Sequence, residues 1–341
     1  MQASRSKSEC FSLALVTLLA FWLPAAARAY TVRVPADYPT IQEGIDAASN
    51  GDEVVVAEGT YSGPLNRGLD TRGKQITVRS ETRPEGTTID CQGRDRGFYI
   101  HQGESQTTVI RGFTIRRGGT RKGLGIYCEG TSPTITECIM IGGSGENQSP
   151  HPEYRGGGIA CENGSPVITD CQFISNATTY GGAIYVYAAP SLRIERCSFQ
   201  GNCAEYFGGG IAMSLADGGV ATIEDCLFIG NLTFSNGGAV AESDSKGSST
   251  VVLRSCRFYG NSANSGGCVT AFTSVLEVDG CEFTENVTER NGGLVCNRDA
   301  QISNSYFTNN FAGDHGGAMT VWGGLTISHC SFIRCAAGEV K

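Results

Sequence analysis

Proline and basic residues are scarce in this sequence, and each scarcity excludes a class of protein. Only 10 of the 341 residues are proline, whereas glycine is abundant at 47. Disordered linkers are usually rich in both residues, so the glycines here are expected to be structural. Lysine and arginine number 26, against 34 aspartates and glutamates. Because phosphate binding needs clustered basic side chains, we expect no nucleic acid as a partner.

Long hydrophobic runs are absent after residue 29, so we expect no transmembrane span in the mature chain. One apolar run lies earlier, over residues 11–26, behind a positively charged start and before Ala27-Arg28-Ala29. This order predicts a signal peptide that is cleaved before Tyr30. The run is shorter than the roughly 20 residues that a membrane-spanning helix needs. We therefore expect a protein that is secreted or displayed at the cell surface.

A unit of about two dozen residues repeats through the second half of the sequence. Each copy has an aliphatic residue three positions before a cysteine, a phenylalanine two positions after that cysteine, an asparagine three further on, and then a Gly-Gly pair. The copies begin at Ile168, Ile194, Ile223, Leu253, Val278 and Ile302, with weaker or partial copies at Ile135 and Ile327. In the copy that begins at Ile302, Ser305 replaces the cysteine.

A repeat of this length fits one turn of a solenoid with three short strands and three corners. Stacked in parallel about 4.8 Å apart, each strand pairs with the turns on either side. The sequence therefore predicts an all-β fold, a right-handed parallel β-helix over residues 30–341, after the signal peptide of residues 1–29.

The repeated residues have distinct expected roles in such a helix. Cysteine and phenylalanine, two positions apart, both point into the core, and phenylalanines on successive turns form an aromatic stack. Asparagine tolerates the left-handed backbone of a corner, and its side chain can bond from turn to turn. The Gly-Gly pair permits a tight corner before the next strand.

The N-terminal part lacks the cysteine and phenylalanine pattern but keeps a similar spacing. We expect a first strand at 31–34 and a helix at 40–48 that covers the open end of the solenoid as a cap. Further strands are predicted at 53–57, 76–79, 88–91, 98–100 and 109–115. At the other end the last copy stops soon after its phenylalanine, so we expect a chain that is truncated at its C-terminus.

Fourteen of the 15 cysteines follow the predicted signal peptide, which in an exported protein first suggests disulfides. In-register stacking makes their side chains parallel, however, and parallel side chains suit a disulfide poorly. We predict mostly reduced thiols that pack as small hydrophobic groups. Cys128 and Cys161, at matching places in neighbouring turns, are the best candidates for a bond. No Cys-x-x-Cys spacing occurs, so we expect no cysteine metal site.

Two resemblances support this fold. The segment Pro39–Ala48, followed by Gly51-Asp52, Val54–Val56 and Gly59–Tyr61, resembles the first segment of pectin-lyase-like right-handed β-helix proteins. The pairing of Gly-Gly-Ala-Ile with Phe-x-x-Asn resembles the repeats of chlamydial polymorphic outer membrane proteins. Together the resemblances span nearly the whole mature chain, and they are specific for the fold rather than for an activity.

Catalytic motifs of pectin-lyase-like enzymes are not recognisable in the sequence. Asp314-His315-Gly316 is the nearest fragment of a polygalacturonase-like site, and it reads more simply as an exposed turn. A row of acidic residues, Glu137, Asp170 and Asp225, is the one candidate for binding Ca²⁺, but Arg196 interrupts it. We therefore assign no catalytic residue, no metal ligand and no cofactor.

A ligand-binding edge is easier to argue. Tyr154, Arg155, Tyr180, Tyr206 and Phe207 stand just before the Gly-Gly corners of three successive turns. Rings about 5 Å apart along one edge could stack on sugar rings, although the same rings could instead pack beneath their own loops. The longest insertion, residues 142–155, adjoins them.

Two hypotheses of function follow. The first is a secreted or cell-surface adhesion or structural protein whose solenoid binds a polysaccharide or another ligand of a host or cell surface. The alternative is a carbohydrate-active enzyme of the pectin-lyase-like class, either a polysaccharide lyase or a glycoside hydrolase.

Overall fold

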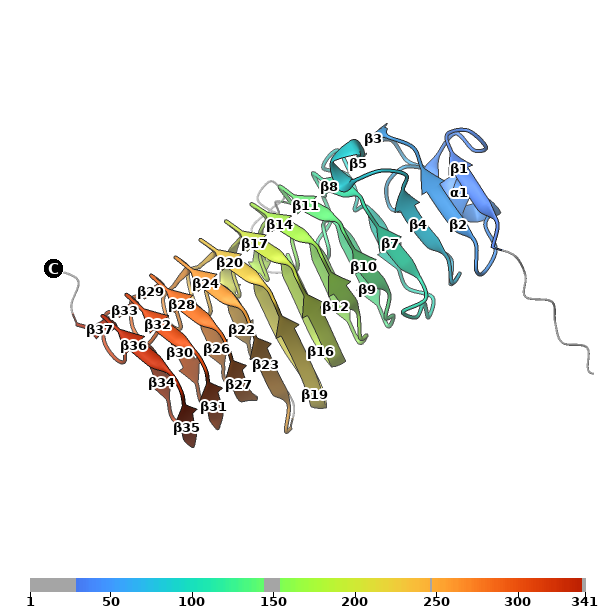
Figure 1. The fold of residues 1–341 in the computed structure, drawn as a ribbon. Coiled ribbons are helices and arrows are strands. Elements are labelled where there is room, and N and C mark those ends of the chain that lie inside the picture. The colour runs from blue at the N-terminus through green and yellow to red at the C-terminus, as the bar shows by residue number, and fades with distance from the viewer. Residues whose placement is uncertain (1–28, 144–153, 246, 339–341) are drawn as a thin grey trace, which may run out of the picture.

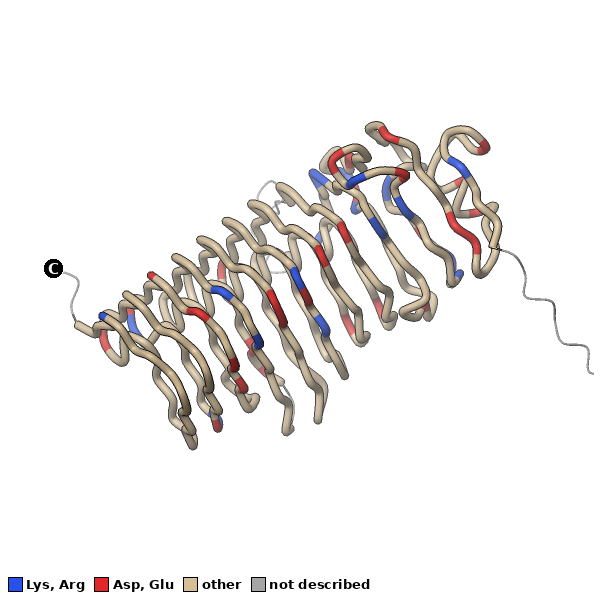
Figure 2. Tube along the Cα trace, viewed as in Figure 1, with Lys and Arg blue, Asp and Glu red and all other residues tan. Residues whose placement is uncertain are grey.

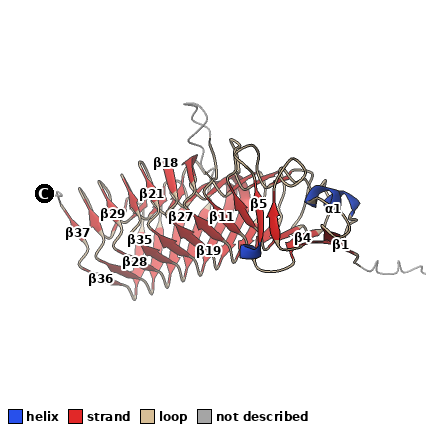
Figure 3. Cartoon of the chain, turned by 90° about the horizontal axis from the view of Figure 1, so that it is seen from above, coloured by secondary structure: helices blue, strands red, loops and turns tan. Residues whose placement is uncertain are grey.

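The computed structural model describes residues 29–143, 154–245 and 247–338 and shows a right-handed parallel β-solenoid of about 11 turns (Figure 1). This confirms the predicted fold class. The helix α1 (Ile41–Ala47) lies at the N-terminal end of the stack (Figure 3), and Thr40 caps it by accepting a hydrogen bond from the backbone N–H of Glu43. Ile41 and Ile45 are fully buried, so the helix covers the first turn as expected.

The strands form four faces, two of which are joined in one 19-stranded sheet. The first face consists of β6 (Phe98–Ile100), β9 (Ile126–Glu129), β12 (Ile159–Glu162), β22 (Val240–Glu242), β26 (Val269–Ala271), β30 (Leu294–Cys296) and β34 (Met319–Val321). The second consists of β1 (Thr31–Val34), β2 (Glu53–Val56), β4 (Thr77–Ser80), β7 (Val109–Arg111), β10 (Thr134–Thr136), β13 (Val167–Thr169), β23 (Thr250–Arg254), β27 (Val275–Asp279), β31 (Ala300–Ser303) and β35 (Leu325–Ser328). Two long strands, β16 (Ile184–Glu195) and β19 (Ile211–Glu224), run through both faces and join them.

The third face is an 11-stranded sheet and the fourth a 7-stranded sheet. The third contains β3 (Gly59–Tyr61), β5 (Thr87–Asp90), β8 (Thr114–Arg116), β11 (Ile139–Ile141), β14 (Gln172–Ile174), β17 (Ser198–Gln200), β20 (Leu227–Ile229), β24 (Arg257–Tyr259), β28 (Glu282–Thr284), β32 (Tyr306–Thr308) and β36 (Ser331–Ile333). The fourth contains β15 (Ala177–Tyr180), β18 (Cys203–Phe207), β21 (Leu232–Thr233), β25 (Ser262–Ala263), β29 (Val287–Thr288), β33 (Phe311–Ala312) and β37 (Ala336–Ala337). A 3₁₀ turn, η1 (Pro84–Gly86), precedes β5.

The predicted ladders are present in the core. Successive phenylalanine rings from Phe173 to Phe332 stack with centroids 4.5–5.0 Å apart. At the next corner each buried asparagine bonds to its neighbour; the Asn202 side-chain nitrogen, for example, donates to Asn231 Oδ1 at 2.9 Å and to the Phe173 carbonyl at 3.0 Å. These contacts satisfy polar groups inside an apolar core, which makes the register of each turn specific.

The ladder cysteines Cys171, Cys197, Cys226, Cys256 and Cys281 are buried and are not joined by disulfides in the structure. The candidate bond between Cys128 and Cys161 was wrong. The two residues are paired in register on β9 and β12, so their side chains leave parallel strands in the same direction, and no disulfide joins them. The sequence predicted one strand at 109–115, but the structure has two strands there, β7 and β8. Gly112, at φ 77°, turns the chain between the second and third faces.

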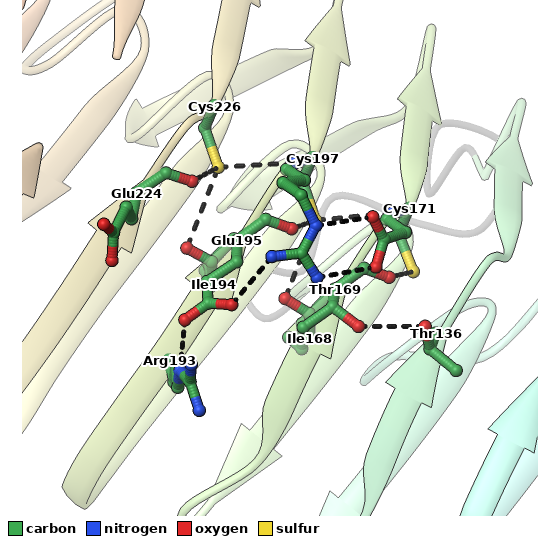
Figure 4. Close-up of polar contacts among 12 residues, drawn as sticks. Thr136, Ile168, Thr169, Cys171, Arg193, Ile194, Glu195, Cys197, Glu224 and Cys226 are labelled. Atoms are coloured by element: carbon green, nitrogen blue, oxygen red, sulfur yellow. Dashed lines mark hydrogen bonds and ion pairs between the residues drawn. The ribbon is translucent and has the colours of Figure 1, made fainter. Parts of the chain in front are cut away.

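Charged residues of both signs are interspersed along the outside of the solenoid (Figure 2). The acidic row considered for Ca²⁺ lies at the corner between the second and third faces. There Arg196 bonds both oxygens of Asp170, at 2.8 and 2.9 Å, and Glu137 pairs with Arg111 at 3.0 Å. Glu195 also pairs with Arg196, and Figure 4 shows its contact with Arg193. Within the described ranges no three potential ligands are grouped for a metal, and two members of the row, Glu137 and Asp170, are held in ion pairs with arginines.

None of the helices in the described part of the chain is long and apolar enough to cross a membrane.

Candidate functional site

Two cavities lie over different turns of the first face, and we call the strip of this face that contains them the groove. One outward-facing residue from each first-face strand forms the floor of the groove. The residues before and after it in the strand point into the core. In register from turn to turn these residues are Tyr99, Tyr127, Ala160, Tyr185, Ala212, Ala241, Thr270, Val295 and Thr320.

One wall of the groove is a row of residues that precede the Gly-Gly corners. They pair by parallel bridges from turn to turn, in the order Lys122, Arg155, Tyr180, Phe207, Asn236 and Ser265. The opposite wall comes from loops that leave the first face, and it includes Asp244, Asn297 and Trp322. We call the part over β9 to β19 the aromatic half and the part over β22 to β34 the amide half.

The aromatic half contains a cavity of about 240 Å³ lined by rings and by a guanidinium group. The Arg155 guanidinium carbon lies 5.1 Å from the Tyr185 ring centroid and 6.0 Å from that of Tyr180, which is the geometry of a cation–π contact. Tyr187 and Phe207 complete the aromatic lining. Tyrosine rings with polar ends and an adjacent donor group are suited to a ligand that has both apolar faces and hydroxyl groups.

A buried carboxylate, Glu162, lies at the centre of this half. Its Oε2 accepts hydrogen bonds from Lys122 Nζ at 2.7 Å and from the Tyr127 hydroxyl at 2.9 Å. Its Oε1 lies 3.6 Å from Arg155 Nη1, which is an ion-pair distance. Two groups at this place are buried without a hydrogen-bond partner, Glu162 Oε1 and Arg155 Nε. A buried acceptor and donor that stay unpaired cost free energy, and a ligand hydroxyl could satisfy both.

Tyr127 and Tyr185 remain neutral to high pH. Burial raises the pKa of Tyr185 to about 12. Burial and the hydrogen bond to the Glu162 carboxylate both raise the pKa of Tyr127 well above its ordinary value. The hydroxyl groups are therefore hydrogen-bond donors, not phenolates, over the whole physiological range.

More rings continue the floor towards the N-terminus. Tyr99 stacks on Tyr127 with centroids 5.3 Å apart, and His101 stacks on Tyr99 at 3.9 Å. The Arg96 guanidinium lies 5.0 Å from both tyrosine centroids. The Tyr99 hydroxyl donates to Glu129 at 2.6 Å, and this bond raises the pKa of Tyr99 to about 12.

The residues predicted as a ligand-binding edge fall into two groups. Arg155, Tyr180 and Phe207 line the cavity of the aromatic half. Tyr154 is buried, and Tyr206, which is 39% exposed, packs on the side of Tyr180 at 5.4 Å between centroids; neither is part of the cavity lining. Arg155 and Phe207, the next residues along the chain, line the cavity. Because successive side chains point to opposite sides of a strand, Tyr154 and Tyr206 point away from it. Residues 146, 151 and 153 of the long insertion lie outside the described residues.

Sequence reasoning missed Lys122, Tyr127, Glu162, Tyr185 and Tyr187. The available signal was alternation within the strands after the Gly-Gly corners, as in Ile184-Tyr185-Val186-Tyr187, where the tyrosines must face outward if the aliphatic residues face the core.

Comparison with known proteins bears on the fold. The family model of the right-handed β-helix region matches residues 42–203 and 182–339. A mannuronic acid specific polysaccharide family 6 lyase from human gut microbiota is similar at 13% identity and a TM-score of 0.45, over 89% of this chain and 87% of that one. An alginate lyase is similar at 13% identity and a TM-score of 0.44, over 83% of this chain and 59% of that one.

A third solved structure is the catalytic unit of a GH87 α-1,3-glucanase from Streptomyces thermodiastaticus, at 12% identity and a TM-score of 0.36, over 90% of this chain and 69% of that one. No curated protein matches the sequence. The resemblance to chlamydial polymorphic outer membrane proteins is not shown by these comparisons. Because the two matched segments together span most of the sequence, the chain belongs to the family of right-handed β-helix proteins.

Proposed function

We propose that this protein is an exported β-helix that binds a polysaccharide in the groove of its first face. The observation that carries the proposal is the pair of buried groups that lack hydrogen bonds, Glu162 Oε1 and Arg155 Nε, beside the rings of Tyr180 and Tyr185. A sugar offers hydroxyl groups to the Glu162 carboxylate and the Arg155 guanidinium, and it offers an apolar ring face to the two tyrosine rings. A groove that runs along the solenoid suits an extended polymer better than a compact ligand.

The location is part of the proposal and rests on the sequence. The apolar run at 11–26 and the small residues after it support export. A groove open along its length supports adhesion to a polymer surface, with the solenoid as the rigid scaffold.

The test is retention of the purified protein in gels that contain individual polysaccharides, both charged and neutral. Tyr187 lines the cavity and is 42% exposed, so Tyr187→Ala should leave the fold intact. Loss of one stacking contact, worth about 0.5–1.5 kcal/mol, should weaken retention by a polysaccharide ligand about 3- to 10-fold. Tyr259→Ala is the matched control, since Tyr259 is similarly exposed at 47% on the third face. Equal retention of both variants and the unmodified protein would refute the groove as the binding site.

Polysaccharide cleavage is the second candidate, and one cluster favours it. Lys122 Nζ and the Tyr127 hydroxyl both contact one carboxylate oxygen of Glu162 on the groove floor. General acid–base catalysis requires groups that can exchange protons at such distances. The same gels can be assayed for release of reducing or unsaturated ends. Release that Lys122→Ala abolishes, while retention persists, would establish an enzyme; retention without release from any polysaccharide would favour a binding protein.

A further inference from the structure

The amide half of the groove holds a larger cavity, of about 690 Å³, whose chemistry differs from that of the aromatic half. Drug-sized or sugar-sized ligands usually occupy cavities of roughly 300–1,000 Å³. The lining consists of Ser235, Asn236, Asn264, Ser265, Phe272, Arg290, Asn291, Val295, Asn297 and Trp322. Carboxamides and hydroxyls predominate, and Arg290 is the one charged residue among these ten.

The carboxamides come from successive turns and are partly held in place by their neighbours. Asn236 Nδ2 donates to Ser235 Oγ at 2.9 Å, and Asn291 Nδ2 donates to Ser265 Oγ at 3.3 Å. Within the described part of the chain, no hydrogen bond joins the side-chain oxygens of Asn236 and Asn291 to a protein donor. Each of these amides can therefore accept a hydrogen bond from a ligand without first breaking one in the protein.

The floor of this half contains a second unsatisfied group. Thr270 is 1% exposed and its hydroxyl has no hydrogen-bond partner. It lies in register between Ala241 and Val295, and Val295 lines the cavity. A buried hydroxyl that lacks a protein partner usually bonds to an ordered water, and Thr270 itself is not part of the cavity lining.

One aromatic ring stands over these groups. Trp322, on the loop after β34, is 58% exposed although it borders the cavity. An exposed tryptophan face beside amide groups is suited to stack on a sugar ring while the amides bond to its hydroxyls. Arg290 is the only charged residue among the ten lining residues, and the amides and hydroxyls around it supply most of the hydrogen-bonding groups.

We infer that the amide half is a distinct subsite that binds a hydroxyl-rich segment of a glycan stacked on Trp322. The inference rests on the proposed function, which it deepens by locating a second subsite for the same polymer. The two halves share one floor and are a few turns of about 4.8 Å apart, so a single chain of several sugar units can occupy both.

The sequence provides a direct reporter for this subsite. It contains two tryptophans, Trp22 and Trp322, so the full chain with Trp22→Phe has Trp322 alone. We expect uncharged gluco- or xylo-oligosaccharides to shift or quench its emission in a saturable titration, because the ring that stacks on Trp322 changes the surroundings of the indole. No saturable change with any uncharged oligosaccharide up to millimolar concentration would overturn the inference.

Variants separate this subsite from the aromatic half. Asn291→Ala should weaken the Trp322 titration about 5- to 10-fold, since it removes an amide that contacts the ligand. Phe234→Ala is the matched control, because Phe234 is 69% exposed beside the cavity without lining it. Tyr187→Ala should leave the Trp322 titration with short oligosaccharides unchanged. If Tyr187→Ala weakens polymer retention while the Trp322 emission never responds, the proposed function stands and the subsite is refuted.

Discussion

At the scale of single residues, the corner asparagines show how a polar group can stabilise an apolar core. Asn231 accepts two hydrogen bonds from Asn202, one from its backbone and one from its side chain, and donates to the Phe199 carbonyl and to Asn261. All four contacts are buried, so none of these groups can turn to water when the partner is lost.

We expect Asn231→Ala to lower the free energy of unfolding by about 3 kcal/mol or more, because unpaired buried groups cost about 1–3 kcal/mol each. Denaturant unfolding of the purified variant would measure the change. Gln200→Ala is the control, since Gln200 is exposed on the adjoining strand, and it should change stability by less than about 0.5 kcal/mol. A variant at Asn231 as stable as the control would show that the ladder contributes nothing net.

At the scale of elements, the sequence predicted the core better than the site. Phenylalanine, cysteine and asparagine recur because they face inward, where each turn imposes the same neighbours on them. The groove residues face outward, where no such constraint repeats, so the residue type varies from turn to turn: Tyr185 is in register with Ala160 and Ala212, and Glu162 with Glu129 and Tyr187. Arg155, Tyr180 and Phe207 could be predicted because they adjoin the Gly-Gly corner. Tyr154 and Tyr206 could not be distinguished from them, since adjacent residues point to opposite sides of a strand.

The buried thiols make stability depend on alkaline pH. Burial raises the pKa of Cys268 well above its ordinary value and raises the pKa of Cys91 to about 12. In the unfolded chain a thiol titrates near about 8.5. A thiol whose pKa is raised by folding makes its full contribution to stability below the unfolded pKa. This contribution is lost as the pH rises from the unfolded towards the folded pKa.

We therefore expect the free energy of unfolding to fall as the pH rises from 8 to 10. Cys268→Ala should reduce that fall by about 1–2 kcal/mol, because one such thiol contributes up to about 1.4 kcal/mol per pH unit above its unfolded pKa. Alanine occupies the equivalent positions Ala183 and Ala239, so the fold should accept it. Urea unfolding at both pH values measures the slope, and identical slopes would contradict a protonated buried thiol at this position.

At the scale of the whole molecule, each turn contacts only its neighbours, as the strand pairings show. Stability in such a solenoid is approximately a sum of terms for each turn and each interface. A local defect should therefore weaken the nearby turns and leave distant ones protected, unlike a defect in a protein with one central core.

Phe228→Ala tests this expectation. Phe228 is fully buried between Phe199 and Phe258, at 4.5 and 4.9 Å between ring centroids. Removing a buried phenylalanine side chain costs about 3–5 kcal/mol. Amide hydrogen exchange should accelerate most in β17, β20 and β24 and least in β2 and β4. Phe98→Ala should give the reverse distribution, and a uniform acceleration in both variants would mean that the solenoid opens as one unit.

The two corners that flank the third face are always two residues long in the turns from β13 onward, whereas the loops that border the groove vary in length. Insertions and deletions during evolution can therefore accumulate beside the groove without disturbing the phenylalanine and asparagine ladders. Duplication of one whole turn would likewise extend the groove and its scaffold together. Selection on what the groove recognises is thus separated from selection on folding, so that homologues with the same core are expected to diverge chiefly in their groove walls.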